Sequence, residues 1–244
     1  MNEQRDLDGL SALVTGATSG IGKAAAGELA RHGAEVLVHG RDAARGQAVV
    51  DAITAEGGKA RFVAADLNDP AALDDLAQQA AGVDVLVNNA GYAWFGPTPE
   101  LDAATFGLLF TANVQAPYFL TAALAPKMAA RGSGSIINIG SMAGTIGLPS
   151  GAAYGATKAA LGALTRAWTA EYSPSGVRVN NVAAGPIYTR PEMHERFATT
   201  GETTALRRAA QPEEIADLVA FLASSKASYI TGAPLAADGG RTAI

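Results

Sequence analysis

The sequence contains no cysteine, which excludes disulfide bonds and thiol catalysis. Its three histidines, His32, His39 and His194, lie far apart in the chain, so no clustered set of metal ligands is expected. Instead, His32 is expected to end a helix and His39 to end a strand. No GxSxG segment occurs, which removes the serine-nucleophile turn found in many α/β hydrolases. These absences indicate that catalysis by this protein would depend on neither a metal ion, nor a thiol, nor a serine nucleophile of the hydrolase type.

Charge and long apolar runs are also scarce. Only 17% of the residues are charged, the net charge is −5, and no dense cluster of lysine and arginine occurs, so nucleic acid is not an expected partner. No uninterrupted apolar run reaches the roughly 18 residues of a membrane-spanning helix, so no membrane partner is expected. The first six residues do not resemble a signal peptide. We therefore expect a cytoplasmic protein.

Short runs rich in β-branched residues alternate with alanine-rich stretches that carry apolar residues at helical spacing. This alternation predicts parallel strands joined by crossover helices. The expected strands are 12–15, 35–38, 60–64, 83–87, 135–139 and 177–182, and the expected helices are 23–31, 43–55, 71–81, 103–130 and 152–172. We therefore predict an α/β fold over residues 1–244, with one doubly wound, Rossmann-type parallel sheet and helices on both faces. The least regular segment, 189–211, is predicted to form a substrate lid.

The first expected strand leads into a glycine-rich segment, 15–22, that precedes a helix. Glycines there let the backbone turn tightly and approach a pyrophosphate, to which the helix N-terminus presents free N–H groups. The spacing is GxxxGxG instead of GxGxxG, so a tight turn without a ligand is the alternative. The candidate phosphate-binding residues are Gly16, Thr18, Ser19, Gly20, Ile21 and Gly22.

The second expected strand ends near the place where such folds bind the cofactor ribose. Arg41 stands at this strand end and could pair with a 2′-phosphate, which favours NADP(H), with NAD(H) as the alternative. The competing interpretation is an arginine that faces solvent, and Asp42 is the expected N-cap of the next helix. The following two strand ends add Asp66, Leu67, Asn88, Ala90 and Gly91 as candidate cofactor contacts, although each could be a turn residue.

The candidate catalytic residues are a tyrosine and a lysine four positions apart, preceded by a serine. Tyr154 and Lys158 fall on one face of an expected helix, and Ser141 follows the strand over 135–139. Reduction of a carbonyl needs a proton on oxygen, and a nearby ammonium lowers the pKa of a phenol and so makes it a usable acid and base. A serine hydroxyl can hold the carbonyl oxygen. An ordinary surface pair at this spacing is the alternative.

With these residues in place, the whole chain resembles the short-chain dehydrogenase/reductase family. The glycine segment, the Asn-Asn-Ala-Gly run at 88–91 and the closing Asp-Gly-Gly at 238–240 carry the resemblance. It implies a catalytic tetrad of Asn113, Ser141, Tyr154 and Lys158, in which Asn113 interrupts its helix and holds a water that links Lys158 to solvent. Tyr154 and Lys158 would also contact the cofactor, Lys158 through the nicotinamide ribose.

The resemblance further implies that Gly185, Ile187 and Thr189 contact the nicotinamide and that the pro-S hydride is transferred. Ala184 replaces the usual proline of this motif, which affects loop rigidity. Ser19 stands where some NADP-binding relatives have a basic residue, so the preference for NADP(H) depends on Arg41.

The expected substrate site is mostly apolar, which favours a hydrophobic ketone or secondary alcohol over a sugar. Its candidate residues are Trp94, Met142, Tyr188, Met193 and Phe197, with Phe95, Ile146 and Leu148 nearby. The rival function is a dinucleotide-binding sensor or scaffold without catalysis. Small and apolar residues on several faces of the helices over 103–130 and 152–172 indicate a partner subunit, and similar proteins pack these helices in dimers and tetramers, so a homotetramer is expected.

Overall fold

Seven parallel strands form one sheet in this computed structural model, which describes residues 5–244. Their order is β3-β2-β1-β4-β5-β6-β7. The order reverses between β1 and β4, the place where doubly wound sheets bind ligands beyond the strand ends. The strands are β1 (Ser11–Val14), β2 (Glu35–Gly40), β3 (Lys59–Ala64), β4 (Val85–Asn88), β5 (Gly134–Ile139), β6 (Val177–Ala184) and β7 (Pro234–Ala237).

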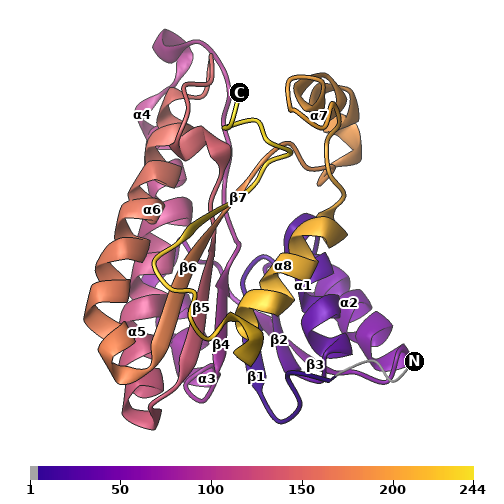
Figure 1. Ribbon diagram of the computed structural model, residues 1–244, viewed down its shortest axis with the longest axis vertical. Helices are drawn as coiled ribbons and strands as arrows, with labels where there is room; N and C mark the ends of the chain where they lie inside the picture. Colours follow the sequence, from indigo (N-terminus) through magenta and orange to yellow (C-terminus); the bar gives the residue numbers. More distant parts are fainter. Residues whose placement is uncertain (1–4) are drawn as a thin grey trace.

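Helices cover both faces of the sheet (Figure 1). One face carries α1 (Gly20–Arg31), α2 (Ala43–Ala55) and α8 (Pro212–Ala223), and the other carries α3 (Pro70–Gln79), α5 (Ala116–Arg131) and α6 (Ala152–Tyr172). Along β1, Leu13 and Val14 point to opposite faces and enter separate apolar cores. Burial on both faces explains why the strands are apolar throughout rather than alternating.

The structure confirms the predicted fold class, and the six expected strands and their helices lie where the alternation placed them, with shifts of one to three residues at most ends. The seventh strand was missed because it begins at Pro234 and contains no β-branched residue. As the edge strand of the sheet it tolerates that proline. Helix α8 was also missed, although Pro212 at its first turn and the capping box of Gln211 with Glu214 were readable signals.

The segment predicted to be irregular, 189–211, contains a helix, α7 (His194–Gly201). It lies beyond the carboxyl ends of the strands, at the upper end of the molecule in Figure 1. The expected long helix over 103–130 is divided into α4 (Ala103–Phe110), a π-helical turn (Thr111–Gln115) and α5.

By length and composition alone, the continuous helical run Ala103–Arg131 could cross a membrane. Core helices pass the same test, and the α5 part of this run buries Leu120, Leu124 and Met128 in the core on one face of the sheet. Its apolar character therefore has an explanation within the fold.

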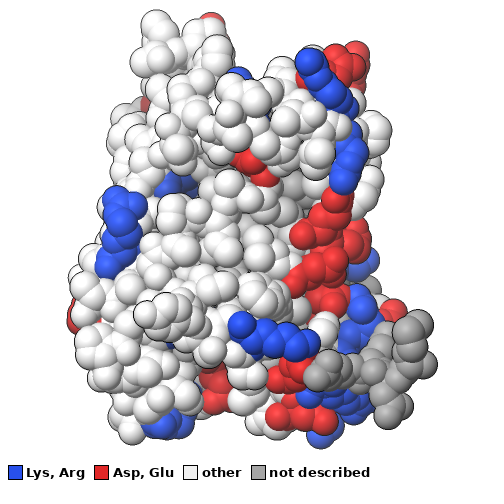
Figure 2. Space-filling model, viewed as in Figure 1, with Lys and Arg blue, Asp and Glu red and all other residues white. Residues whose placement is uncertain are grey.

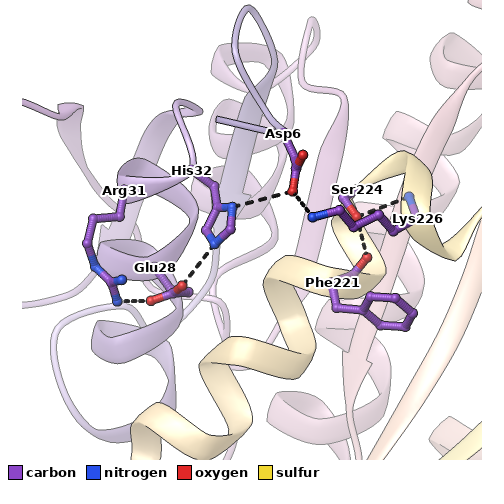
Figure 3. Close-up of polar contacts among 7 residues, drawn as sticks. All are labelled: Asp6, Glu28, Arg31, His32, Phe221, Ser224 and Lys226. Atoms are coloured by element: carbon purple, nitrogen blue, oxygen red, sulfur yellow. Dashed lines mark hydrogen bonds and ion pairs between the residues drawn. The ribbon is translucent and has the colours of Figure 1, made fainter. Parts of the chain in front are cut away.

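A network of ion pairs joins three segments at the amino-terminal ends of the strands (Figure 3). Asp6 contacts Lys226, 2.5 Å away, in the turn after α8, and lies 4.0 Å from the His32 ring at the C-cap of α1. His32 also contacts Glu28 at 3.1 Å, and Glu28 pairs with Arg31. His32 thus ends a helix, as predicted, and the network fastens the start of the chain to α1 and α8.

Candidate active site

The glycine-rich turn between β1 and α1 needs its glycines for two different reasons. Gly16 and Gly20 have φ values of +64° and +51°, in the left-handed region that residues with a Cβ rarely adopt. At Gly22 an added Cβ would lie 2.3 Å from the side-chain nitrogen of Asn89 and 2.4 Å from the carbonyl oxygen of Gly16. The turn is therefore tight because helix α1 packs directly on it.

The end of β4 holds this turn in place through side chains that cross between the two strands. The Thr15 hydroxyl accepts hydrogen bonds from the backbone N–H groups of Asn89 and Ala90, both at 3.0 Å. The Asn89 side chain donates to the carbonyl oxygens of Thr15 and Gly16 at 2.8 and 3.2 Å. The Asn-Asn-Ala-Gly run thus acts mainly as a clamp for the turn, and Thr15 and Asn89 are positioning residues absent from the predicted site.

His39, expected only to end a strand, also supports the turn. The Gly16 N–H donates to Nδ1 of His39 at 3.2 Å, which leaves Nε2–H to donate to the Ala65 carbonyl oxygen at 3.2 Å. Burial lowers the pKa of His39 to about 4, because a charged ring would lose its water and could not accept from Gly16. The neutral ring therefore links the ends of β1, β2 and β3.

The start of α1 presents backbone N–H groups that no side chain caps. Ser19 is the N-cap, and its side chain makes no capping hydrogen bond. Such groups, together with the helix dipole, attract phosphate oxygens. Thr189 lies over this turn, because a Cβ on Gly20 would be 3.0 Å from Cβ of Thr189. The structure therefore brings one predicted nicotinamide-binding residue to the predicted phosphate-binding turn.

Gly185 and Ile187, which follow β6, are held in position by close contacts with the protein interior. Gly185 lies against Asp238, where a Cβ would come within 2.6 Å of the Asp238 Cα. Ile187 is buried in the same core as α1 and α8. The backbone of this segment is thereby fixed next to α1, whereas the Ile187 side chain points into the interior.

The part of the predicted site that would contact the cofactor ribose, at the ends of β2 and β3, is exposed. Arg41 follows β2 and is open to solvent, and Asp42 caps α2 by accepting from the Arg45 N–H at 3.0 Å, as predicted. Asp66 is also exposed and accepts from the backbone and side chain of Asn68. Leu67 packs partly against the core. Asp66 is therefore both a turn former and a candidate ligand contact.

Asn88, a predicted cofactor contact, lies buried where β4 pairs with β5. Its side chain points into the interior, donates to the Asn138 side chain at 2.8 Å, and is 2% exposed. The reason is strand alternation, which turns Asn88 inward between β4 and β5 and leaves Asn89 to face the turn. Asn88 therefore organises the core beneath the site instead of offering its side chain to a ligand, while Ala90 and Gly91 remain at the strand end.

Ser141, Tyr154 and Lys158 come together at the carboxyl end of β5. Tyr154 and Lys158 occupy successive turns of α6, with the Lys158 Nζ 5.8 Å from the centre of the Tyr154 ring. Nζ donates to the carbonyl oxygen of Ile139, the last residue of β5, at 2.7 Å. Ser141 begins a short 3₁₀ turn, and its Oγ accepts from the Ala143 N–H. The predicted side chains therefore converge through α6 packing on β5.

Burial dominates the electrostatics of this group. It raises the pKa of Tyr154, opposed by a hydrogen bond with Ser141, and it lowers the pKa of Lys158 to about 8. The sequence argument predicted the opposite direction for Tyr154. The reason for the difference is that burial of Tyr154 itself disfavours the charged phenolate, a cost that the sequence argument left out.

Asn113 lies at the centre of the π-helical turn, where the expected interruption of the helix occurs. Its side chain is saturated with protein contacts. Oδ1 accepts from the Tyr92 N–H at 2.8 Å, and Nδ2 donates to the Tyr92 carbonyl oxygen and to the Thr157 hydroxyl. The side chain thus fastens the loop after β4 to α6 beside Lys158. A relay water at this position would have to use the backbone groups that the π turn displaces.

The predicted substrate residues gather around Tyr154 and α7. Phe95 packs on Tyr154 with ring centres 5.2 Å apart. Tyr188 stacks on His194 at 4.4 Å and meets Phe197 edge-on at 6.4 Å. Trp94 and Met193 are half-buried, and Met142 is buried. Of the remaining candidates, Ile146 and Leu148 are half-buried.

Two cavities open near the strand ends, and neither is lined by the predicted substrate residues. One of about 210 Å³ lies between Gly185, Ile187 and the start of α8, and another of about 170 Å³ reaches Ser141 and Lys158 from the side of β6 and β7. Within residues 5–244 no group of three or more histidine, aspartate or glutamate side chains is arranged to hold a metal ion.

The sequence comparisons agree with this geometry. A protein family described as enoyl-(acyl carrier protein) reductase matches residues 16–242. The galactitol 2-dehydrogenase (L-tagatose-forming) of Cereibacter sphaeroides is 42% identical over 248 residues, which cover 97% of this chain and 96% of that enzyme.

Solved structures match over nearly the whole length. A protein described as a short chain dehydrogenase/reductase family protein is 51% identical, with a TM-score of 0.93, and the match covers 98% of this chain and 100% of that one. A putative NAD(P)-dependent gluconate 5-dehydrogenase from Beutenbergia cavernae, with NADP bound at low occupancy, is 40% identical with a TM-score of 0.93, covering 98% of this chain and 99% of that one.

Proposed function

The chain belongs to the short-chain dehydrogenase/reductase family, and from this premise we propose that Tyr154 is the general acid/base of a hydride transfer between NADP(H) or NAD(H) and a ketone or secondary alcohol. The observation that carries the proposal is the convergence of Ser141, Tyr154 and Lys158 at the end of β5, beside a clamped glycine turn.

The roles of the side chains follow from their positions. The nicotinamide supplies or accepts the hydride. In the reducing direction Ser141 holds the carbonyl oxygen, and the phenol of Tyr154 gives that oxygen its proton. A raised pKa keeps the phenol protonated for this step. Lys158, with a pKa of about 8, changes its protonation near neutral pH and can return a proton to Tyr154. In the oxidising direction the same transfers run backwards.

NADP(H) is the proposed cofactor, with NAD(H) as the alternative. Arg41 supports this choice, because its exposed guanidinium follows β2 and is free to form a bidentate pair with a 2′-phosphate. NADP in the Beutenbergia relative is consistent with it.

An apolar ketone or secondary alcohol is the proposed substrate class. The aromatic ring of Phe95 supports it, because it offers an apolar wall next to Tyr154, and Tyr188 and Phe197 add apolar rings at α7. The name of the galactitol relative points instead to a polyol, so polyols belong in any test.

A homotetramer in the cytoplasm is the proposed state. Two separate surfaces carry large exposed apolar side chains, one with Tyr118 and Phe119 on α5 and the other with Phe221 and Tyr229 around the end of α8. Figure 2 shows broad surface without charged residues beside the charged rim that follows α1 and α8. Two different self-complementary interfaces generate a tetramer. A monomeric mass by light scattering at micromolar concentration would contradict this state.

The decisive experiment measures oxidation of NADPH and NADH with aryl and alicyclic ketones, aldehydes and keto sugars, and reduction of NADP⁺ and NAD⁺ with the alcohols and polyols. Turnover of ketones supports the proposal. Cofactor binding without turnover of any compound would favour the dinucleotide sensor. Polyols or sugars with a higher kcat/KM than the ketones would overturn the apolar substrate class.

The Arg41→Ala variant tests the cofactor choice in the same assay. Loss of a charged pair worth about 1.5–3 kcal/mol predicts a kcat/KM for NADPH that is roughly ten- to a hundredfold lower, with NADH little affected. Equal losses for both cofactors would show that Arg41 does not read the phosphate.

A further inference from the structure

One cation of the 189–211 segment stands next to the proposed catalytic residue. The guanidinium carbon of Arg196, on α7, lies 4.0 Å from the centre of the Phe95 ring. Phe95 in turn packs on Tyr154, with ring centres 5.2 Å apart. Phe95 therefore contacts both the guanidinium of Arg196 and the ring of Tyr154.

The charge of Arg196 is not neutralised by the protein. Within residues 5–244, its guanidinium has neither a carboxylate within 4.0 Å nor a hydrogen-bond acceptor, although Glu192 and Glu195 lie on the same segment. Arg208, later in the same segment, is by contrast held by both carboxylate oxygens of Glu214. The N–H donors of Arg196 therefore have no protein partner among these residues, while its guanidinium lies over the Phe95 ring.

We propose that Arg196 binds a carboxylate of the substrate, so that the enzyme acts on oxo acids or hydroxy acids with an apolar body. This inference rests on the proposed function, because it places the acid group relative to a carbonyl held by Tyr154 and Ser141. The carboxylate lies beyond Phe95 and the reacting carbon lies before it, so several bonds separate the two groups.

The chemistry of the site fits such a molecule at both ends. A guanidinium presents two parallel N–H donors that match the two oxygens of a carboxylate. Its contact with Phe95 reduces the conformational entropy that Arg196 would lose on binding an anion, because the ring already restricts the side chain. The rings of Phe95, Tyr188 and Phe197 accept the apolar part of the substrate. Arg196 is therefore a specificity-determining residue and not a general electrostatic feature of the surface.

The test compares two matched probes in the reducing direction. Sodium 5-oxohexanoate carries a carboxylate, and methyl 5-oxohexanoate has the same ketone and carbon chain without the charge. We expect the native enzyme to prefer the acid in kcat/KM. The Arg196→Gln variant should reduce that preference about ten- to a hundredfold, mainly through KM, since the contact is made in both ground and transition states. Arg196→Lys keeps the positive charge but lacks the two parallel N–H donors. Its preference for the acid should therefore lie between those of the native enzyme and Arg196→Gln.

Arg190→Gln is the matched control, because Arg190 is an exposed arginine of the same segment without the ring contact. It should leave the preference for the acid unchanged, which separates a local contact from a general loss of positive charge. Thermal unfolding and cofactor binding, both expected to be unaffected in Arg196→Gln, show that the variant is folded.

The outcomes separate this inference from the proposed function. Turnover of both probes with equal kcat/KM, or an acid preference that survives in Arg196→Gln, overturns the role of Arg196 and leaves the oxidoreductase intact. Absence of turnover with these ketones and with the whole ketone and aldehyde panel overturns both.

Discussion

The two ends of the parallel sheet differ in whether their polar side chains have partners within the protein. At the amino-terminal ends, Asp6, Glu28 and their partners satisfy one another (Figure 3). At the carboxyl ends, and among residues 5–244, Lys158 is buried without a carboxylate partner, Arg196 has a guanidinium without a hydrogen-bond acceptor, and α1 has no side-chain cap. The first end closes the fold, whereas the second leaves donors available to ligands. Changes at the two ends should therefore affect different properties.

The largest effect is expected at Tyr154. Tyr154→Phe removes only the oxygen that we propose moves the proton, so kcat should fall about 10²- to 10⁴-fold while cofactor affinity and thermal stability stay near native values. Steady-state kinetics and a fluorescence titration with NADPH measure the two parts. Tyr118→Phe, on the exposed face of α5, is the control. Activity of Tyr154→Phe within a few fold of native would remove Tyr154 from the mechanism.

Gly22 and Gly27 of α1 give the next comparison, because they lie on one helix at different distances from the site. Gly22→Ala forces a Cβ into the Asn89 side chain and the Gly16 backbone, so it should lose several kcal/mol of stability or most of its cofactor affinity. Gly27→Ala meets nothing within 4 Å and should gain up to about 1 kcal/mol from helix propensity. Thermal unfolding and NADPH titration of both variants check this. Equal stability and equal NADPH affinity of the two variants would contradict the tight packing of α1 on the glycine turn and Asn89.

A smaller effect should appear in the pH dependence of stability. The folded state holds His39 neutral, with its pKa lowered to about 4 from 6.5. Between these values the unfolded chain binds more protons, so the free energy of unfolding rises with pH, and stability is lost as the pH falls from 6.5 towards 4. Urea unfolding at several pH values measures the slope. His39→Gln should show a shallower slope in this window, and an unchanged slope would assign the effect to other groups.

The smallest effect is expected at the opposite end of the sheet. Asp6→Asn weakens a partly exposed ion pair with Lys226, which should cost about 1 kcal/mol or less and leave kcat unchanged. Thermal unfolding and kinetics of this variant test the division of roles between the ends. A large loss of activity at constant stability would show that the amino-terminal network is coupled to the site.

The sequence was most informative where a residue's role depends on local chemistry. The alternation of strands and helices, the glycine turn, and the spacing of Tyr154 and Lys158 predicted the sheet and the convergence at β5. The sequence did not predict the directions of the Asn88 and His39 side chains, because the direction of a side chain at a strand end depends on the neighbouring strands. It also missed α7, which lies in the segment 189–211 whose composition predicted irregular structure, and α8, which follows that segment.

What the sequence by itself determined is the fold class and the residue types available to the candidate site, because strand and helix periodicity and residue identity are properties of the chain alone. Only the tertiary structure decided that burial raises the pKa of Tyr154 and lowers that of Lys158, and that Arg196 stands one ring away from them. The physical reason is that desolvation and cation–π contacts depend on which segments pack together. That packing brings α7, the loop after β4 and α6 to the same end of the sheet.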